Sequence, residues 1–181
     1  MAIPEPSPGK AQLRKHMRQL LCGLDPAADK ANAALGQWLR DRPALRTIAL
    51  YHPLPREVDF TSTHRQLSDL TWVYPKVSGN ELSFHAINDL ATELSAGAFG
   101  ILEPADGLPT VPIGAIDAFI CPGLAFDPRG GRLGRGRGFY DRMLAQARPD
   151  ALKVGACYEP QYVEDTHAEA HDVHMDHVIV G

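Results

Sequence analysis

Apolar residues near the start of the chain recur at the spacing of helices. Ser7-Pro8 is a typical helix start, and the apolar stripe that follows it predicts a first helix. The members of the stripe are Leu13, Met17, Leu20, Leu21 and Leu24. Asp25-Pro26 repeats the start signal, and residues 27–40 are rich in helix formers. A second helix is therefore expected there, with Leu35, Trp38 and Leu39 on its buried side.

From residue 47 onward, short apolar runs alternate with helical stretches. Strands are expected at 47–51, 72–74, 81–87, 116–121, 151–158 and 177–180, and helices at 61–70 and 139–147. Pro75 is expected to end its strand, and the Pro/Gly-rich stretch 97–114 to be a long surface connection. Strands separated by helices predict an α/β sheet covered on both faces, in a single domain over residues 1–181.

Composition excludes several classes of protein. The chain has 181 residues and 44% hydrophobic content, enough for one core. No apolar run approaches the ~20 residues of a membrane span, and the proline-rich start lacks the apolar region of a secretory signal. Cys22, Cys121 and Cys157 are widely spaced, which argues against disulfides and a zinc ribbon. A cytoplasmic protein with no membrane partner is expected.

A cationic segment follows the strand expected at 116–121. The formal net charge of the chain is −4, so an anionic ligand must be attracted locally. Five arginines, Arg129, Arg132, Arg135, Arg137 and Arg142, lie among five glycines. Glycines at 134, 136 and 138 let successive backbone N–H groups approach phosphate oxygens, and the arginines add charge-assisted hydrogen bonds. The position between a strand and a helix is where α/β proteins place ligands.

Residue spacing alone leaves three interpretations of this segment open. It matches neither the P-loop nor a clean dinucleotide-binding pattern, so an ordinary glycine-rich turn competes with a phosphate site. The runs Arg129-Gly-Gly-Arg132 and Arg135-Gly-Arg-Gly138 also suggest an RGG-like nucleic-acid segment. The acidic chain and the ordered flanks argue against nucleic acid, because RGG segments normally lie in disordered polar tails.

A longer pattern narrows the choice. The run Phe126-Asp-x-x-Gly-x-Arg-Leu-Gly-Arg-Gly-x-Gly-Phe-Tyr-Asp141 resembles the signature of 5-formyltetrahydrofolate cyclo-ligases, also called methenyltetrahydrofolate synthetases. Further family patterns are Lys10-x-x-x-Arg14, Pro53-x-x-x-Glu57-Val-Asp59, Phe99-Gly-Ile-x-Glu103-Pro104 and His171-Asp172-Val-x-x-Asp176, in the family's order. The resemblance spans almost the whole chain. It implies a three-layer α/β/α domain with a mainly parallel sheet, similar to the NagB/RpiA/CoA-transferase-like fold.

The resemblance also implies an activity and its residues. The activity is the ATP-dependent closure of 5-formyltetrahydrofolate to 5,10-methenyltetrahydrofolate, a C–N ligase reaction with Mg²⁺ as cofactor. The ATP-binding residues implied are Lys10, Arg14, Arg132, Leu133, Gly134, Arg135, Gly136, Arg137, Gly138, Phe139 and Tyr140, of which Arg132, Arg135 and Arg137 would be catalytic. The folate-binding residues implied are Arg14, Glu57, Arg135, Gly136, Gly138 and Phe139. The metal-binding residues implied are Asp141 and Asp172. A monomer that takes polyglutamylated folates and no nucleic acid is expected, with an ATP-binding paralogue of different substrate as the alternative.

Taken by themselves, several of these residues have simpler interpretations. Lys10 and Arg14 lie on the stripe of Met17 and Leu21, where they would repel each other unless a polyanion lies between them, or else extend into water. Glu57 could be a solvated carboxylate in a turn. Asp141 could serve merely as a cap at the start of the helix that follows the glycines, where the helix dipole favours a carboxylate.

The sequence departs from the family pattern in three places. Residues 60–62 lack the polar substrate contact of some relatives, and Arg137 stands where many have lysine or glycine. Many relatives have a proline just upstream of His171, and this chain lacks it. The chain also has three further histidines near His171, which are His167, His174 and His177. Histidines at these separations could share a zinc ion, and the alternative is that they have no common role.

Overall fold

The computed structural model describes the chain except for residues 1–7, 25–26, 80 and 98–99. The start signals at Ser7 and at Asp25-Pro26, and Phe99 of the family pattern, lie outside the described residues. The predicted helices are present as α1 (Pro8–Cys22) and α2 (Asp29–Arg40). Helix α2 buries Leu35, Trp38 and Leu39 as predicted. Of the first stripe, Met17 and Leu21 are buried, whereas Leu13, Leu20 and Leu24 are partly buried and Leu24 lies beyond the end of α1.

A seven-stranded sheet forms the centre of the molecule, in the order β11-β10-β7-β1-β2-β3-β6. Its strands are β1 (Thr47–Ala49), β2 (Thr71–Ser78), β3 (Glu81–Ala86), β6 (Thr110–Val111), β7 (Ala118–Pro122), β10 (Leu152–Cys157) and β11 (His177–Val180). Neighbouring strands from β11 to β2 are parallel, whereas β2–β3 and β3–β6 are antiparallel. The predicted α/β class with a mainly parallel sheet is confirmed.

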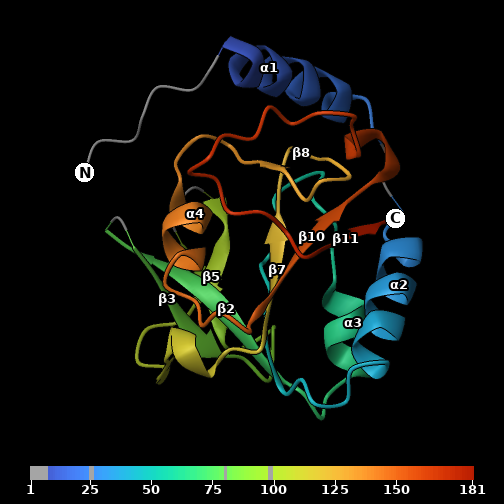
Figure 1. Ribbon diagram of the computed structural model, residues 1–181. Helices are drawn as coiled ribbons and strands as arrows, with labels where there is room; N and C mark the ends of the chain where they lie inside the picture. The colour runs from blue at the N-terminus through green and yellow to red at the C-terminus, as the bar shows by residue number, and fades with distance from the viewer. Residues whose placement is uncertain (1–7, 25–26, 80, 98–99) are drawn as a thin grey trace.

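Helices cover both faces of this sheet (Figure 1). The first face packs against α2 and α3 (Thr61–Gln66), and the second against α4 (Phe139–Leu144). Strand β7 shows why the sequence requires two covered faces. Ala118 and Ile120 belong to the core beneath α2, whereas Phe119 and Cys121 belong to the core beneath α4, and all four are at most 2% exposed. A strand buried on both faces is an uninterrupted apolar run.

Helix α1 packs on a hairpin rather than on the central sheet. The hairpin consists of β8 (Ala125–Phe126) and β9 (Arg132–Leu133). Met17 and Leu21 of α1 form a separate core with Leu124, Ala125 and Leu133. In Figure 1 the helix accordingly crosses one end of the molecule, above the label of β8. This packing brings the amino-terminal cations to the glycine-rich segment.

Two local predictions are wrong. Strand β2 continues through Pro75 to Ser78, because β1 pairs only with residues 71–73 and Pro75 therefore interrupts no hydrogen bonds to β1. The stretch 97–114 is not a plain surface connection. It contains β5 (Leu102–Pro104), which pairs with β4 (Leu94–Ala96), as well as β6 and a 3₁₀ turn (Ile113–Ala115). Strands of two or three residues are too short to show alternation in sequence.

All three cysteines are free thiols. Cys22 is exposed, whereas burial raises the pKa of Cys121 and of Cys157 to about 12. Among the residues described, no helix combines the length and the apolar character needed to span a bilayer.

Candidate functional site

The site residues gather at the carboxyl ends of the parallel strands. The chain leaves β1 toward β2 on one side, whereas β7 lies on the other, so the strand order reverses between β1 and β7. Open α/β sheets bind ligands in the crevice outside such a reversal point. Glu57 follows β1, and the glycine-rich segment follows β7. Both predicted subsites therefore begin beside this reversal point, which we call the β1/β7 crevice.

Asp127 shapes the turn of the β8–β9 hairpin. Its carboxylate accepts hydrogen bonds from the backbone N–H groups of Arg129 and Gly131, and from both the N–H and the hydroxyl of Thr166, at 2.6–3.0 Å. Burial opposes ionisation, but these bonds outweigh it and lower the pKa of Asp127. Gly130 has φ +81°, and a Cβ there would collide with the backbone of Met175. The turn is therefore fixed against the C-terminal segment.

The glycine segment continues from this hairpin into α4. Gly136 (φ +103°) and Gly138 (φ +64°) adopt backbone conformations that favour glycine, and Gly138 is the N-cap of α4. Helix α1 lies against the segment, because Arg14 Nε donates to the carbonyl of Gly134 at 3.0 Å. Arg14 therefore lies beside the glycine segment, and its contact with ATP stays a prediction.

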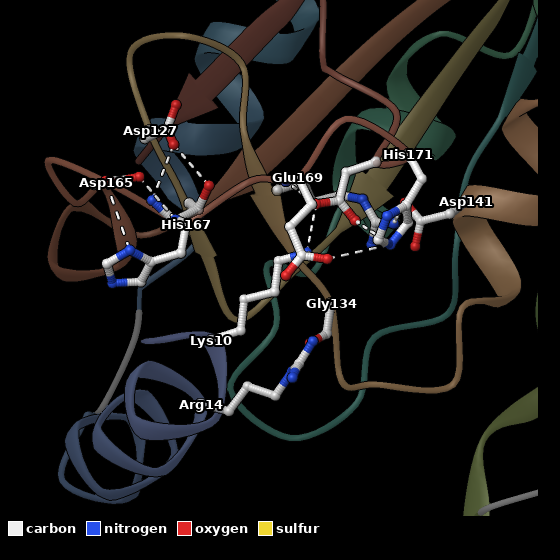
Figure 2. A network of polar contacts seen from close by, with 12 residues as sticks. Lys10, Arg14, Asp127, Gly134, Asp141, Asp165, His167, Glu169 and His171 are labelled. Carbon is white, nitrogen blue, oxygen red and sulfur yellow. Dashed lines mark hydrogen bonds and ion pairs between the residues drawn. The ribbon is translucent and has the colours of Figure 1, made fainter. Parts of the chain in front are cut away.

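Lys10 forms the centre of a second group of contacts, shown in Figure 2. Its ammonium lies 2.5 Å from a carboxylate oxygen of Asp172 and 3.5 Å from one of Glu169, although the lysine is only 5% exposed. Asp172 also accepts from the Glu169 backbone N–H at 2.6 Å. Burial disfavours the Asp172 carboxylate, but that N–H and Lys10 lower its pKa.

The expected repulsion between Lys10 and Arg14 is compensated by these carboxylates. Lys10 is paired directly, and the negative charges of Asp172, Glu169 and Asp141 raise the pKa of Arg14. Burial is the largest influence on Arg14 and, together with Arg18, lowers its pKa overall. Arg18, one turn further along α1, is thus a like charge that lowers the pKa of Arg14.

Arg132 and Asp141 form a third ion pair across the glycine segment. Arg132 Nη2 donates to Asp141 Oδ1 at 2.8 Å, and the guanidinium lies over the ring of Tyr140, 5.3 Å from its centroid. The Arg132 side chain is 4% exposed, and its Nε has no hydrogen-bond partner among the described residues. Gly138 occupies the N-cap of α4, and Asp141 lies in the first turn, where the helix dipole favours its charge without a side-chain capping hydrogen bond.

Glu57 and Arg135 form the pair that joins the two predicted subsites. Arg135 Nε and Nη2 donate to Glu57 Oε1 at 3.1 and 2.9 Å, while the Leu54 backbone N–H donates to Oε2 at 2.9 Å. The Glu57 side chain is 8% exposed and that of Arg135 is 42% exposed. Glu57 is thus held in a fixed position and is not a solvated turn residue.

The remaining predicted residues differ in what they offer. Leu133 is 1% exposed in the core under α1, so only its backbone could face a ligand. Phe139 lies at the start of α4, with the Arg142 guanidinium 5.2 Å from its ring centroid. Arg137 is exposed, and its carbonyl accepts from Arg142 Nη1 at 3.0 Å.

Three tyrosines interact with Glu57, and of these the sequence predicted only Tyr140 as a site residue. Tyr51 follows β1, Tyr140 starts α4, and Tyr158 follows β10 and directs its hydroxyl toward the Glu57 carbonyl at 3.4 Å. Burial, then the charge of Glu57, raises the pKa of Tyr51. Tyr140 was expected from the motif only as an ATP contact. The signal for Tyr51 was present, because the first apolar run ends on it at the carboxyl edge of the sheet.

The C-terminal histidines do not converge on one point. His177 stacks on Trp38, His174 Nδ1 bonds the Arg129 carbonyl at 3.0 Å, and His171 lies near Glu169 and Asp172. Within the described ranges, no three His, Cys, Asp or Glu residues are arranged to hold a metal ion. The structure thus gives no support to the zinc interpretation.

Comparison with known proteins identifies the family. A model of the 5-formyltetrahydrofolate cyclo-ligase family matches residues 7–181. The chain belongs to this family. The relative from Mycoplasma pneumoniae, a 5-formyltetrahydrofolate cyclo-ligase, is 33% identical over 83% of this chain and 82% of its own. That from Mycolicibacterium smegmatis is 42% identical over 48% of this chain, and the match spans under half, 45%, of that relative's length.

Solved structures agree with this assignment. The 5,10-methenyltetrahydrofolate synthetase of Aquifex aeolicus superposes with a TM-score of 0.79 at 33% identity, covering 94% of this chain and 89% of that one. The synthetase of Mycoplasma pneumoniae gives 0.75 at 29% identity, covering 94% and 97%. By family, the protein is an enzyme, a cyclo-ligase.

Proposed function

We propose that this protein uses ATP to close the N5-formyl group of 5-formyltetrahydrofolate onto N10, giving 5,10-methenyltetrahydrofolate, ADP and phosphate. The observation that carries the proposal is the Glu57–Arg135 pair at the β1/β7 crevice. It places a fixed carboxylate, suited to a pterin, directly beside a cation suited to phosphate. Membership of the cyclo-ligase family supports the same reaction.

The nucleotide subsite would lie between α1 and the glycine segment. Lys10, Arg14 and Arg132 approach this region from two elements that the α1–hairpin core holds together. Gly136 and Gly138 adopt positive φ, which favours glycine, and without side chains they leave the backbone open to the phosphates. Arginines bind phosphate through paired charge-assisted hydrogen bonds. Aligning the two substrates is the main contribution of such a site.

The folate subsite would lie on the other side of Arg135. A carboxylate can accept from the amino and ring N–H groups of a pterin, which present two donors side by side. Glu57 is pre-oriented for this contact by the Leu54 N–H. Arg135 covers one carboxylate oxygen in the structure, so the pterin and the guanidinium compete for it.

Ion-pair exchange would convert these contacts into a binding site. Lys10, Arg132 and Arg135 each pair with a carboxylate, so their charges are balanced in the structure. Triphosphate oxygens would draw the cations away, which leaves Asp141 and Asp172 as free carboxylates.

These carboxylates fit a magnesium ion that arrives with the nucleotide. Mg²⁺ binds through one or two carboxylates, substrate phosphates and water, and needs no cage built only from protein. Asp141 and Asp172 both lie near Arg14, whose pKa responds to their charges. When bound, the ion would neutralise phosphate charge, and Asp141 and Asp172 would hold it.

The chemistry requires activation of a poor leaving group. The formyl oxygen would attack the γ-phosphorus and release ADP, and N10 would then add to the resulting iminium carbon and lose its proton. Loss of inorganic phosphate completes the methenyl product. Lys10, Arg14 and Arg132 would hold the phosphates in line, and Arg135 and Arg137 would offset the charge that develops. Free thiols agree with a reducing cytosol, which we propose as the compartment.

The test is the appearance of methenyl-folate absorbance from 5-formyltetrahydrofolate, ATP and magnesium. Turnover that needs all three supports the proposal. Nucleotide binding without turnover would instead indicate a paralogue with another substrate. Submicromolar RNA binding at physiological salt, unaffected by ATP and folate, would favour the RGG interpretation.

A further inference from the structure

One buried hydroxyl near the end of β1 has no hydrogen-bond partner among the described residues. Tyr51 is 4% exposed, and its hydroxyl oxygen makes no hydrogen bond to any residue that the structure describes. Leaving such a group unpaired in the interior is costly, and native proteins pair the great majority of them. A buried hydroxyl without a partner among the described residues is therefore a candidate ligand contact.

The packing of Tyr51 places it near the proposed folate contact. Tyr51 follows β1 and shares a core with Tyr158, whose hydroxyl donates to the Glu57 carbonyl at 3.4 Å. After burial, the groups that act most strongly on the Tyr51 pKa are Glu57, Tyr140 and Tyr158, followed by Cys121. These residues come from the ends of β1, β7 and β10 and the start of α4, which border the β1/β7 crevice. The ring itself packs edge-on against Phe60, with 6.3 Å between centroids. The aromatic body is thus anchored in the core, while the charge of Glu57 acts on its polar end.

The hydroxyl is available as a donor at neutral pH. Burial and the Glu57 charge raise its pKa, so the phenol stays protonated. Glu57 can only accept hydrogen bonds when ionised, whereas a pterin edge carries both N–H donors and a carbonyl oxygen. A carboxylate and a phenol side by side would satisfy both kinds of group.

We propose that Tyr51 is a specificity-determining residue of the folate subsite, whose hydroxyl donates a hydrogen bond to the pterin when the ring takes the place of Arg135 on Glu57. This inference rests on the proposed function. The Tyr51 hydroxyl would donate to the carbonyl oxygen of the pterin, and the Glu57 carboxylate would accept from its N–H groups. No covalent role is involved, since the phenol only binds.

A second tyrosine provides a matched control. Tyr74 is 2% exposed and lies on the same face of the sheet, but its hydroxyl is paired with His64 Nδ1 at 2.9 Å. Tyr74→Phe removes a satisfied bond and should lower Tm without changing folate binding. Tyr51→Phe removes an unsatisfied hydroxyl, so Tm should stay the same or rise, because a buried group without a partner destabilises the fold.

The experiment measures the Kd of 5-formyltetrahydrofolate, the Kd of a non-hydrolysable ATP analogue with magnesium, and Tm, for the wild-type protein and both variants. We expect Tyr51→Phe to raise the folate Kd roughly two- to tenfold, the loss of one neutral hydrogen bond, with the nucleotide Kd unchanged. An unchanged folate Kd, or a fall in Tm like that of Tyr74→Phe, would overturn the inference. Failure of the wild-type protein to bind the folate at all would instead refute the proposed function.

Discussion

Arg135→Gln tests whether the nucleotide and folate subsites communicate through one side chain. Arg135 occupies the carboxylate that the pterin is proposed to use. Nucleotide phosphates that draw the guanidinium away would therefore make Glu57 available. Binding of one substrate should then tighten binding of the other, by the same factor in both directions.

The structure sets the size of this coupling. Hydrogen bonds between charged groups contribute ~1.5–3 kcal/mol, but 42% exposure of Arg135 places the pair in partial solvent screening. A contribution of about 1 kcal/mol corresponds to a change in folate Kd of about fivefold. The wild-type protein should bind 5-formyltetrahydrofolate about that much more tightly when a non-hydrolysable ATP analogue and magnesium are saturating.

Isothermal titration of the folate with and without the analogue provides the assay. In Arg135→Gln the effect of the nucleotide should vanish, and the folate alone should bind at least as tightly as it does to the wild-type protein. Arg129→Gln is the control, because Arg129 belongs to the same cationic segment but pairs with Asp165 at 2.7 Å and leaves Glu57 untouched. Coupling that persists in Arg135→Gln, or folate binding that weakens equally with and without nucleotide, would refute the exchange.

Three further changes test the rest of the site. Arg14→Ala should alter Tm little but weaken binding of the ATP analogue roughly ten- to hundredfold, and a lower Tm with normal kinetics would remove α1 from the site. Asp141→Asn should keep the fold, since Gly138 caps α4, yet raise the magnesium concentration needed for turnover; an unchanged magnesium profile would contradict the metal role. The pKa of Asp127 is lowered in the folded protein, so its stabilisation is complete above an ordinary aspartate pKa of ~3.9 and is lost below it. Tm measured from pH 6 to ~3 should therefore fall more for the wild-type protein than for Asp127→Asn, and parallel curves would show that Asp127 contributes nothing.

Sequence patterns predicted the elements that depend on neighbouring residues, through the spacing of apolar side chains in a helix or strand. The first apolar stripe has helical spacing, and its members Met17 and Leu21 are buried as expected. The run 116–121 is apolar throughout because both faces of β7 are covered. The glycine segment was recognisable because phosphate binding requires close backbone approach, and its place after β7 follows from the alternation of strands and helices.

Long-range pairing could not be predicted in the same way. Lys10 and Asp172 are separated by 162 positions, and Arg135 and Glu57 by 78, so only the folded sheet brings them together. The family resemblance indicated that these residues belong to one site but not that they neutralise one another. The short strands β4, β5 and β6 were not predicted for a related reason. Each has only two or three residues, so its pairing with another strand defines it and its own sequence does not.

The contrast between the three thiols makes the protein suitable for labelling at a single position. Thiol reagents attack the thiolate, and at neutral pH a pKa of about 12 leaves Cys121 and Cys157 almost entirely protonated inside the core. Maleimide dyes should therefore react at Cys22 alone, without any cysteine being removed. Cys22 is the last residue of α1, the helix that carries Lys10 and Arg14. A fluorophore placed there would report in real time how that helix responds when nucleotide is added.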